Sequence, residues 1–186
     1  MQIDNLLKMN FSIRKATLED RPALKELIAK SARKLSEQDY GSVQIEAAVN
    51  SVFGVDTDLI HDETYFVAED ESGLIGCGGW SQRRTLYGGD QFPDRDASYL
   101  DPATDAAKIR AFFVHPDHAR KGVGRAILGV CEQAAAQAGF RAIELMSTLP
   151  GIKFYEASGY SGDTRFELDL KGVKLELLPM RKELDK

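Results

Sequence analysis

The sequence predicts an α/β fold in which helices flank a mixed β-sheet. Three observations support this fold class: a strand hairpin over residues 64–81, a strand–helix–strand unit over residues 109–147, and a closing strand pair over residues 166–178. Antiparallel strands followed by a crossover unit indicate a mixed sheet. With 186 residues the chain is long enough for one domain, which we place at residues 11–186, after a short leader at residues 1–10.

The first elements are a strand and two helices. Residues 11–15 form the predicted strand, and Thr17-Leu18-Glu19-Asp20 resembles a capping box at the start of a helix. A second helix is expected over residues 43–52, with Gly54 as its terminator. The apolar residues of the first helix recur at helical spacing, at Leu24, Leu27, Ile28 and Ala32.

The hairpin joins strands 64–69 and 74–81 through an acidic, glycine-containing turn, and Trp80 belongs to its core-facing residues. Residues 82–107 follow with little periodicity, two prolines and Gly88-Gly89. A loop of this length is either functional or a flexible insertion. Its first polar and aromatic residues could form a lid or acceptor pocket, or could simply be solvated; they are Arg83, Arg84, Tyr87 and Asp90.

A strand over residues 109–114 is apolar except for Arg110, as expected near the centre of a sheet, and His115-Pro116 ends it. A helix over residues 124–138 follows and ends at Gly139. Its expected buried side carries Ile127, Cys131, Ala135 and Ala138. The remaining elements are a strand at 142–147, a helix at 152–158 and strands at 166–170 and 174–178.

Composition excludes several classes of protein. The net charge of −5 and the pI near 5.3 argue against nucleic acid as the main partner, because proteins that grip phosphate backbones present basic surfaces. No apolar run approaches the length of a membrane span. Cys77 and Cys131 have no metal-ligand spacing, so we expect two buried thiols, no metal site and a reducing, cytoplasmic location.

The loop between the strand at 109–114 and the next helix has the composition of an anion site. Backbone N–H groups at a helix N-terminus bind phosphate, and glycine lets the phosphate approach the backbone. The spacing matches neither a P-loop nor a dinucleotide fingerprint. Alone, the pattern equally suits a tight turn with solvated charges. The glycines and cations are Arg120, Lys121, Gly122, Gly124 and Arg125.

Two motifs resemble those of GNAT-superfamily acetyltransferases. The first runs F-V-H-P at 113–116, R-K-G-V-G at 120–124 and I-L at 127–128; the second is F-Y-E-A-S-G-Y at 154–160. The entry strand and helix, the hairpin and P-M-R-K at 179–182 also fit. The resemblance covers the chain from about residue 11 to the C-terminus, apart from residues 82–107.

The resemblance implies a centrally splayed sheet that holds acetyl-CoA as cosubstrate. Phe112 and Val114 would pair with the pantetheine arm. Ala119 departs from the family motif, which usually has Arg or Gln there, so backbone amides would carry most of the pyrophosphate contact, with Arg120 substituting. The expected pyrophosphate-binding residues are Arg120, Lys121, Gly122, Val123, Gly124, Arg125 and Ala126.

The resemblance also suggests catalytic residues. Tyr155 is the candidate general acid for the departing thiolate, because a phenol is protonated at neutral pH; the alternative is that it only packs a short helix. Glu144 is the nearest candidate base, although a surface-facing carboxylate explains it at least as well. Asp90 and His118 are weaker candidates, and a water chain to bulk solvent could replace them all.

We therefore expect an N-acetyltransferase that moves an acetyl group from acetyl-CoA to a primary amine, with coenzyme A and an amine acceptor as partners. The sequence leaves open whether the protein forms a homodimer. The alternatives are a non-catalytic acyl-CoA-binding module and a phosphate- or nucleotide-binding interaction module that uses only the glycine loop.

Overall fold

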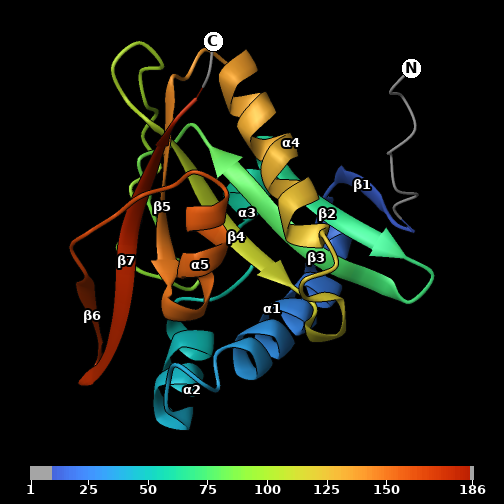
Figure 1. The fold of residues 1–186 in the computed structure, drawn as a ribbon, viewed down its shortest axis with the longest axis vertical. Coiled ribbons are helices and arrows are strands. Elements are labelled where there is room, and N and C mark those ends of the chain that lie inside the picture. The colour runs from blue at the N-terminus through green and yellow to red at the C-terminus, as the bar shows by residue number, and fades with distance from the viewer. Residues whose placement is uncertain (1–9, 185–186) are drawn as a thin grey trace.

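The computed structural model describes residues 10–184, so nearly all of the predicted leader lies outside the described residues. Within this range the strands form one mixed sheet in the order β1-β2-β3-β4-β5-β7-β6 (Figure 1). The strands are β1 (Ser12–Lys15), β2 (Tyr65–Asp70), β3 (Gly73–Ser81), β4 (Ala107–Val114), β5 (Ala142–Thr148), β6 (Phe166–Leu170) and β7 (Val173–Glu183).

Five α-helices between residues 10 and 184 accompany the sheet: α1 (Arg21–Leu35), α2 (Ser42–Ser51), α3 (Thr57–His61), α4 (Val123–Gln137) and α5 (Ile152–Ala157). Short 3-10 helices are η1 (Leu18–Asp20), η2 (Pro116–His118) and η3 (Leu149–Gly151). None of the helices in this range combines the length and the apolar character that crossing a membrane requires.

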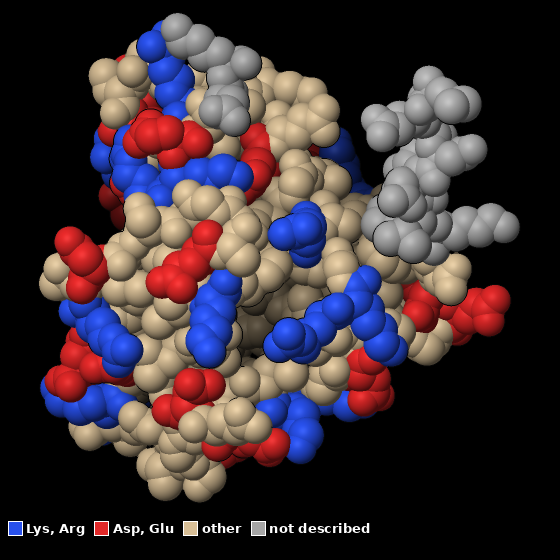
Figure 2. Space-filling view, viewed as in Figure 1, with Lys and Arg blue, Asp and Glu red and all other residues tan. Residues whose placement is uncertain are grey.

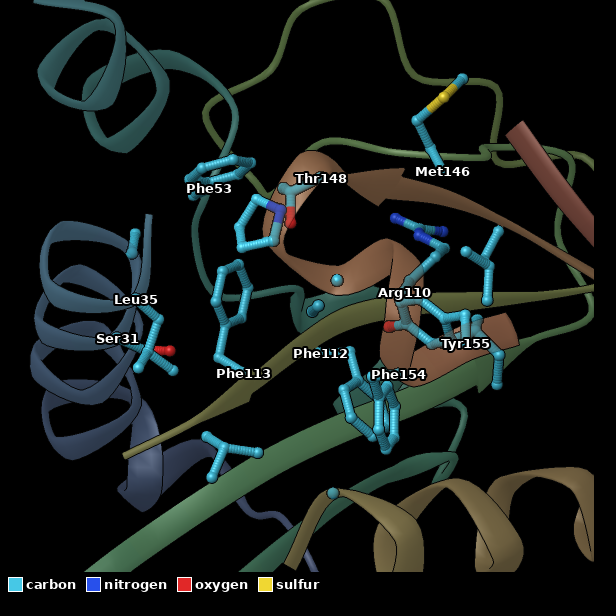
Figure 3. A pocket seen from close by; sticks show the side chains of 18 of the residues that line it. Ser31, Leu35, Phe53, Arg110, Phe112, Phe113, Met146, Thr148, Phe154 and Tyr155 are labelled. Carbon is cyan, nitrogen blue, oxygen red and sulfur yellow. The ribbon is translucent and has the colours of Figure 1, made fainter. Parts of the chain in front are cut away.

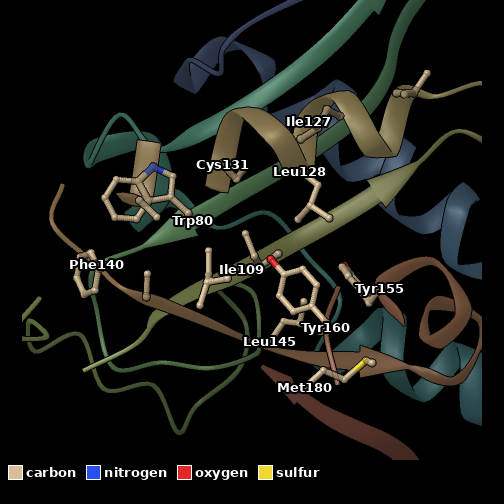
Figure 4. Packing of buried hydrophobic residues seen from close by; sticks show 14 of the residues in the cluster. Trp80, Ile109, Ile127, Leu128, Cys131, Phe140, Leu145, Tyr155, Tyr160 and Met180 are labelled. Atoms are coloured by element: carbon tan, nitrogen blue, oxygen red, sulfur yellow. The ribbon is translucent and has the colours of Figure 1, made fainter. Parts of the chain in front are cut away.

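The helices cover both faces of the sheet. Val67 packs with the α1 residues Leu24 and Ile28, whereas its neighbour Ala68 packs with Ile127 of α4. Successive strand residues point to opposite faces, so α1 and α4 lie on opposite sides. Figure 4 shows the core beneath α4, an apolar cluster that includes Trp80, Ile109, Cys131 and Tyr160. Both cysteines are buried and free, as predicted.

Three predicted details are wrong. Helix α3 was not expected, because a five-residue helix is too short to show a periodic pattern; Asp56 caps it by accepting from the Leu59 amide at 3.4 Å. Strand β7 continues to Glu183, where the sequence predicted an end at residue 178. Ala138 is exposed, because α4 ends one residue before it.

Residues 82–106 contain no helix and no strand beyond an isolated bridge between Arg83 and Tyr99. The segment is nevertheless tied to α3. Arg83 donates to Asp62 at 2.6 Å, and Arg95 donates to Asp56 at 2.9 Å and to Asp58 at 2.7 Å. The insertion is therefore anchored by charge-assisted hydrogen bonds rather than by regular structure.

The sheet opens between β4 and β5. These parallel strands pair only at Ala107 with Ile143 and at Lys108 with Glu144. From there β5 stays paired with β7 along its whole length, while β4 stays paired with β3. In Figure 1 the arrows of β4 and β5 run apart toward their C-terminal ends. The predicted central splay is confirmed.

Candidate functional site

A cavity of about 660 Å³ occupies the opening between β4 and β5. Side chains of β4, α1, α5 and the segment after α2 point toward it in Figure 3. In the space-filling view of the molecule, a hollow lies between α1, α4 and α5, and Lys and Arg side chains surround its opening (Figure 2). The cavity thus reaches from the face covered by α1 to the start of α4 on the other face.

The start of α4 forms one end of the cavity. Gly122, with φ of 86°, is left-handed, and a Cβ added there would meet no atom within 4 Å. Among the hydrogen bonds of residues 10–184, the first along the helix joins the Ala126 amide to the Gly122 carbonyl. The amides of Val123, Gly124 and Arg125 precede it and have no acceptor in this range. Free amides at a helix start bind anions.

Four of the seven predicted loop residues line the cavity: Arg120, Gly122, Gly124 and Arg125. Lys121 is exposed and lies outside the lining. Val123 and Ala126 are also outside it, and the Val123 side chain is 1% exposed because it packs into the core. Only backbone groups of these last two residues are therefore suited to a ligand.

The wall formed by β4 contains a β-bulge. Cys77 pairs with Phe113 and Gly79 with Arg110, so two residues of β4, Ala111 and Phe112, stand opposite one residue of β3. Ala111 has φ of 49°. Gly78 is the residue opposite, and an added Cβ there would lie 2.3 Å from the Phe112 ring. Because Gly78 has no side chain, the Phe112 ring can occupy the space next to it.

Two buried side chains hold the bulge. The Tyr65 hydroxyl donates to the Ala111 carbonyl at 3.3 Å, and the Cys77 thiol approaches the same oxygen at 3.5 Å. Because C=O and N–H point in opposite directions across a trans peptide, the Phe112 N–H points away from Tyr65. Strand β5 offers this N–H no partner, since its pairing with β4 ended at Lys108.

Tyr155 lies where the cavity meets the core under α4. Its ring packs against Phe112, Phe154 and Tyr160, with centroids 5.0–6.1 Å apart. The hydroxyl points into the cavity (Figure 3) and has no hydrogen-bond partner within residues 10–184. Burial, with a smaller contribution from Cys131, raises the pKa of this phenol, so it stays protonated at neutral pH.

The candidate bases lie elsewhere. Glu144 accepts from Lys108 and Arg181, at 2.5 and 2.9 Å, and does not line the cavity. Asp90 accepts from the Thr57 amide at 2.9 Å, and His118 faces Asp70 at 3.7 Å. Neither belongs to the cavity wall, which in the described part of the chain contains no Asp or Glu.

The insertion contributes to the cavity through a short stretch. Leu86, Tyr87, Gly88 and Gly89 line it, whereas Arg83 and Arg84 do not. The Tyr87 ring packs on Phe92 at a centroid distance of 5.4 Å. Of the four insertion residues that the sequence singled out, the structure brings Tyr87 alone to the cavity.

Arg110 is a residue of the wall whose role the sequence analysis missed. Its side chain is 1% exposed and forms an ion pair with Asp56, which is equally buried. Burial lowers the pKa of this guanidinium and raises that of the Asp56 carboxyl. The available signal was a single arginine within an otherwise apolar strand. Arginine is rarely buried without a charged partner, and the sequence pattern did not show which residue that partner is.

Comparisons with known proteins give the cavity a context. The sequence model of the acetyltransferase (GNAT) family matches residues 23–160. A GCN5-related N-acetyltransferase from Rhodopseudomonas palustris has a similar structure, with a TM-score of 0.68, 19% identity, and coverage of 93% of this chain and 95% of that one. A search of curated proteins found no matching relative.

Two similar structures contain ligands. The PaiA N-acetyltransferase from Thermoplasma acidophilum, solved with coenzyme A, has a TM-score of 0.64 at 18% identity and covers 94% of this chain and 99% of its own. The yncA putative acetyltransferase from Salmonella typhimurium, solved with acetyl-CoA, has a TM-score of 0.61 at 16% identity and covers 95% of each chain. These likenesses establish the shared fold.

Proposed function

Because the chain belongs to the acetyltransferase (GNAT) family, we propose that it transfers an acetyl group from acetyl-CoA to a primary amine by direct attack. One observation carries the proposal. The cavity lies where β4 and β5 separate, and it ends at three amides of α4 that have no acceptor within residues 10–184. A long, thin cosubstrate with a pyrophosphate at one end fits such a shape. The CoA complex of PaiA and the acetyl-CoA complex of yncA support this choice of ligand.

The start of α4 would hold the pyrophosphate. The amides of Val123, Gly124 and Arg125 and the positive end of the helix dipole both favour an anion. Arg120 and Arg125 line the same end of the cavity and would add charge. Arg120 follows Ala119, so it would supply the side-chain contact that the family motif usually places one residue earlier.

The edge of β4 would hold the pantetheine arm and the thioester. Val114 and Phe112 lie beyond the last residue of β4 that pairs with β5. Strand β5 therefore does not occupy their backbone groups on the edge of β4 that faces it, and a ligand can pair with them. The Phe112 N–H, turned away from Tyr65 by the bulge, would donate to the thioester carbonyl oxygen. A donor aimed at oxygen stabilises the negative charge that develops there during attack.

The transfer itself needs the acceptor nitrogen to lose two protons and the leaving sulfur to gain one. The amine nitrogen attacks the thioester carbon, the carbon–sulfur bond breaks, and the electron pair leaves with sulfur. Tyr155 would donate its proton to this thiolate. The ammonium form of the acceptor must lose one proton before attack, and since no carboxylate lines the cavity among residues 10–184, we assign this step to water rather than to Glu144. The nitrogen loses a second proton as the amide forms, and the Tyr155 phenolate takes up a proton from water.

Thiol release from acetyl-CoA tests the proposal. A panel of amines, amino acids, polyamines, aminoglycosides and peptides should contain at least one compound that speeds release above the rate of hydrolysis, with the acetylated amine detected by mass spectrometry. Tight binding of coenzyme A with no turnover of any amine would instead indicate a non-catalytic acyl-CoA-binding protein.

A further inference from the structure

Arg110 lies on the same face of the sheet as α1 and Phe113, opposite to α4. Residues 109 and 110 point to opposite faces of β4, and Ile109 packs under α4. The part of the cavity on the α1 face is the part that the start of α4 does not reach. It would therefore receive the acceptor.

The guanidinium has unused hydrogen-bonding capacity. One Nη atom is taken by the ion pair with Asp56, which is its one salt bridge within residues 10–184, whereas Nε and the other Nη are buried and have no hydrogen-bond partner in this range. Asp56 is shared, because Arg95 donates to it at 2.9 Å. A guanidinium carries five N–H donors, and buried donors without acceptors destabilise a structure. An acceptor group supplied by a ligand would satisfy them.

The surrounding wall discriminates against cations. Apart from Arg110, the charged residues that line the cavity are Arg120 and Arg125, and no carboxylate lines it within the described range. A substrate with several ammonium groups, such as a polyamine or an aminoglycoside, would find no counter-charge. The α1 side is otherwise largely apolar, with Phe53 and Phe113 packed edge to face at 5.6 Å.

We propose that Arg110 binds a carboxylate of the acceptor, so that the acceptor is an amino acid or related primary amine with a carboxylate and an apolar side chain. The inference rests on the proposed function and names its substrate class. The Arg110 side chain is 1% exposed, so a carboxylate can reach the guanidinium only when a side chain of the cavity wall moves aside. Met146, which lines the same cavity, is unbranched and flexible, and it is suited to moving aside.

Matched substrates test the inference. Phenylalanine and leucine are compared with their primary amides by thiol release from acetyl-CoA, and the acid-to-amide ratio of kcat/KM is measured. The double variant Asp56→Asn/Arg110→Met removes both buried charges together, so that neither is left unpaired. Comparing the ratio between wild type and variant cancels the intrinsic reactivity of each amine. We expect the ratio to fall about 10- to 100-fold, the value of a charge-assisted hydrogen bond.

A matched control separates binding from structural support. Arg83 of the insertion and Asp62 beside α3 form another largely buried pair, but neither lines the cavity. The variant Asp62→Asn/Arg83→Met should leave the acid-to-amide ratio unchanged. If the Arg110 double variant does not bind coenzyme A, Arg110→Lys replaces it; this keeps the charge with fewer donors and should lower the ratio several-fold.

Two results would overturn the inference. The first is an acid-to-amide ratio that is the same in wild type and in every Arg110 variant that binds coenzyme A. The second is a preference of the wild-type enzyme for polyamines over all carboxylate-bearing amines. Failure of every amine to release thiol, with coenzyme A still bound, would refute the proposed function itself and this inference with it.

Discussion

Replacing Gly122 by Asp or by Asn separates charge from backbone shape at the start of α4. Gly122 has φ of 86°, and an added Cβ meets no atom within 4 Å, so either side chain fits. Asn and Asp both tolerate the left-handed conformation, and we expect them to pay a similar backbone cost of about 1 kcal/mol. The two variants then differ by one negative charge next to the proposed pyrophosphate site.

The charge difference sets the magnitude. Two like charges 4 Å apart repel by about 1 kcal/mol in water and about 4 kcal/mol at an effective dielectric constant near 20. Gly122 is exposed, so the lower part of this range applies. We expect Gly122→Asp to bind coenzyme A roughly 5- to 30-fold more weakly than Gly122→Asn, the ratio that about 1 to 2 kcal/mol produces.

Isothermal titration calorimetry of coenzyme A at low and high salt provides the measurement. The ratio of the two dissociation constants should shrink as salt rises, because the Debye length falls from about 10 Å at 0.1 M to about 3 Å at 1 M. Equal dissociation constants for two folded variants at low salt would show that the pyrophosphate does not lie at Gly122, and the placement of the cosubstrate would be refuted.

Four further predictions follow from the same geometry. Arg120→Ala should weaken coenzyme A binding more than Arg125→Ala if Arg120 replaces the missing motif residue; equal, negligible losses in calorimetry would leave the backbone amides alone responsible. Tyr155→Phe should lower kcat about 100- to 10,000-fold with little change in KM or in thermal stability, because its hydroxyl has no hydrogen-bond partner in residues 10–184; full turnover with chemistry rate-limiting would return Tyr155 to core packing. Tyr65→Phe should lower kcat about fivefold, as expected for losing one hydrogen bond of about 1 kcal/mol that orients the bulge, while coenzyme A affinity stays constant; an unchanged kcat would argue against the orienting role. Asp20→Asn should lower the melting temperature at pH 7, and the difference from wild type should shrink as pH falls from 4 to 2, because Arg14 lowers the pKa of Asp20 to about 2 and the stabilisation exists only while the carboxylate is charged; a difference as large at pH 2 as at pH 7 would contradict it.

The sequence predicted the parts of the fold that repeat a pattern or a motif. The hairpin, the apolar strand β4 and the long helix α4 each carry enough periodic residues to be recognised. Helix α3 carries too few, and its cap Asp56 is defined by tertiary ion pairs as much as by local sequence. Residues 82–106 are tied to α3 by Arg83 and Arg95, whose partners there, Asp62, Asp56 and Asp58, lie more than 20 positions away, so no local pattern could have shown this anchoring.

In the candidate site too, residues that belong to motifs were predicted, whereas residues that act through tertiary contacts were not. Gly122 and Tyr155 belong to motifs and were predicted. Arg110 was visible in the sequence as an anomaly, but its partner Asp56 lies 54 positions earlier, so only the fold could bring the two together. Tyr65 likewise holds the bulge through a contact between distant parts of the sequence, from its hydroxyl on β2 to the Ala111 carbonyl on β4. The sequence offered Glu144 as a candidate base or as a surface-facing carboxylate, and the structure places it in ion pairs with Lys108 and Arg181, outside the cavity lining.

A crystal structure of the complex with coenzyme A tests the central claim most directly. The account predicts that the pyrophosphate oxygens accept hydrogen bonds from the amides of Val123, Gly124 and Arg125. It also predicts that the pantetheine arm lies between β4 and β5, with its sulfur near the Tyr155 hydroxyl and the Phe112 N–H. Coenzyme A bound elsewhere, with the space between β4 and β5 unfilled, would contradict the account.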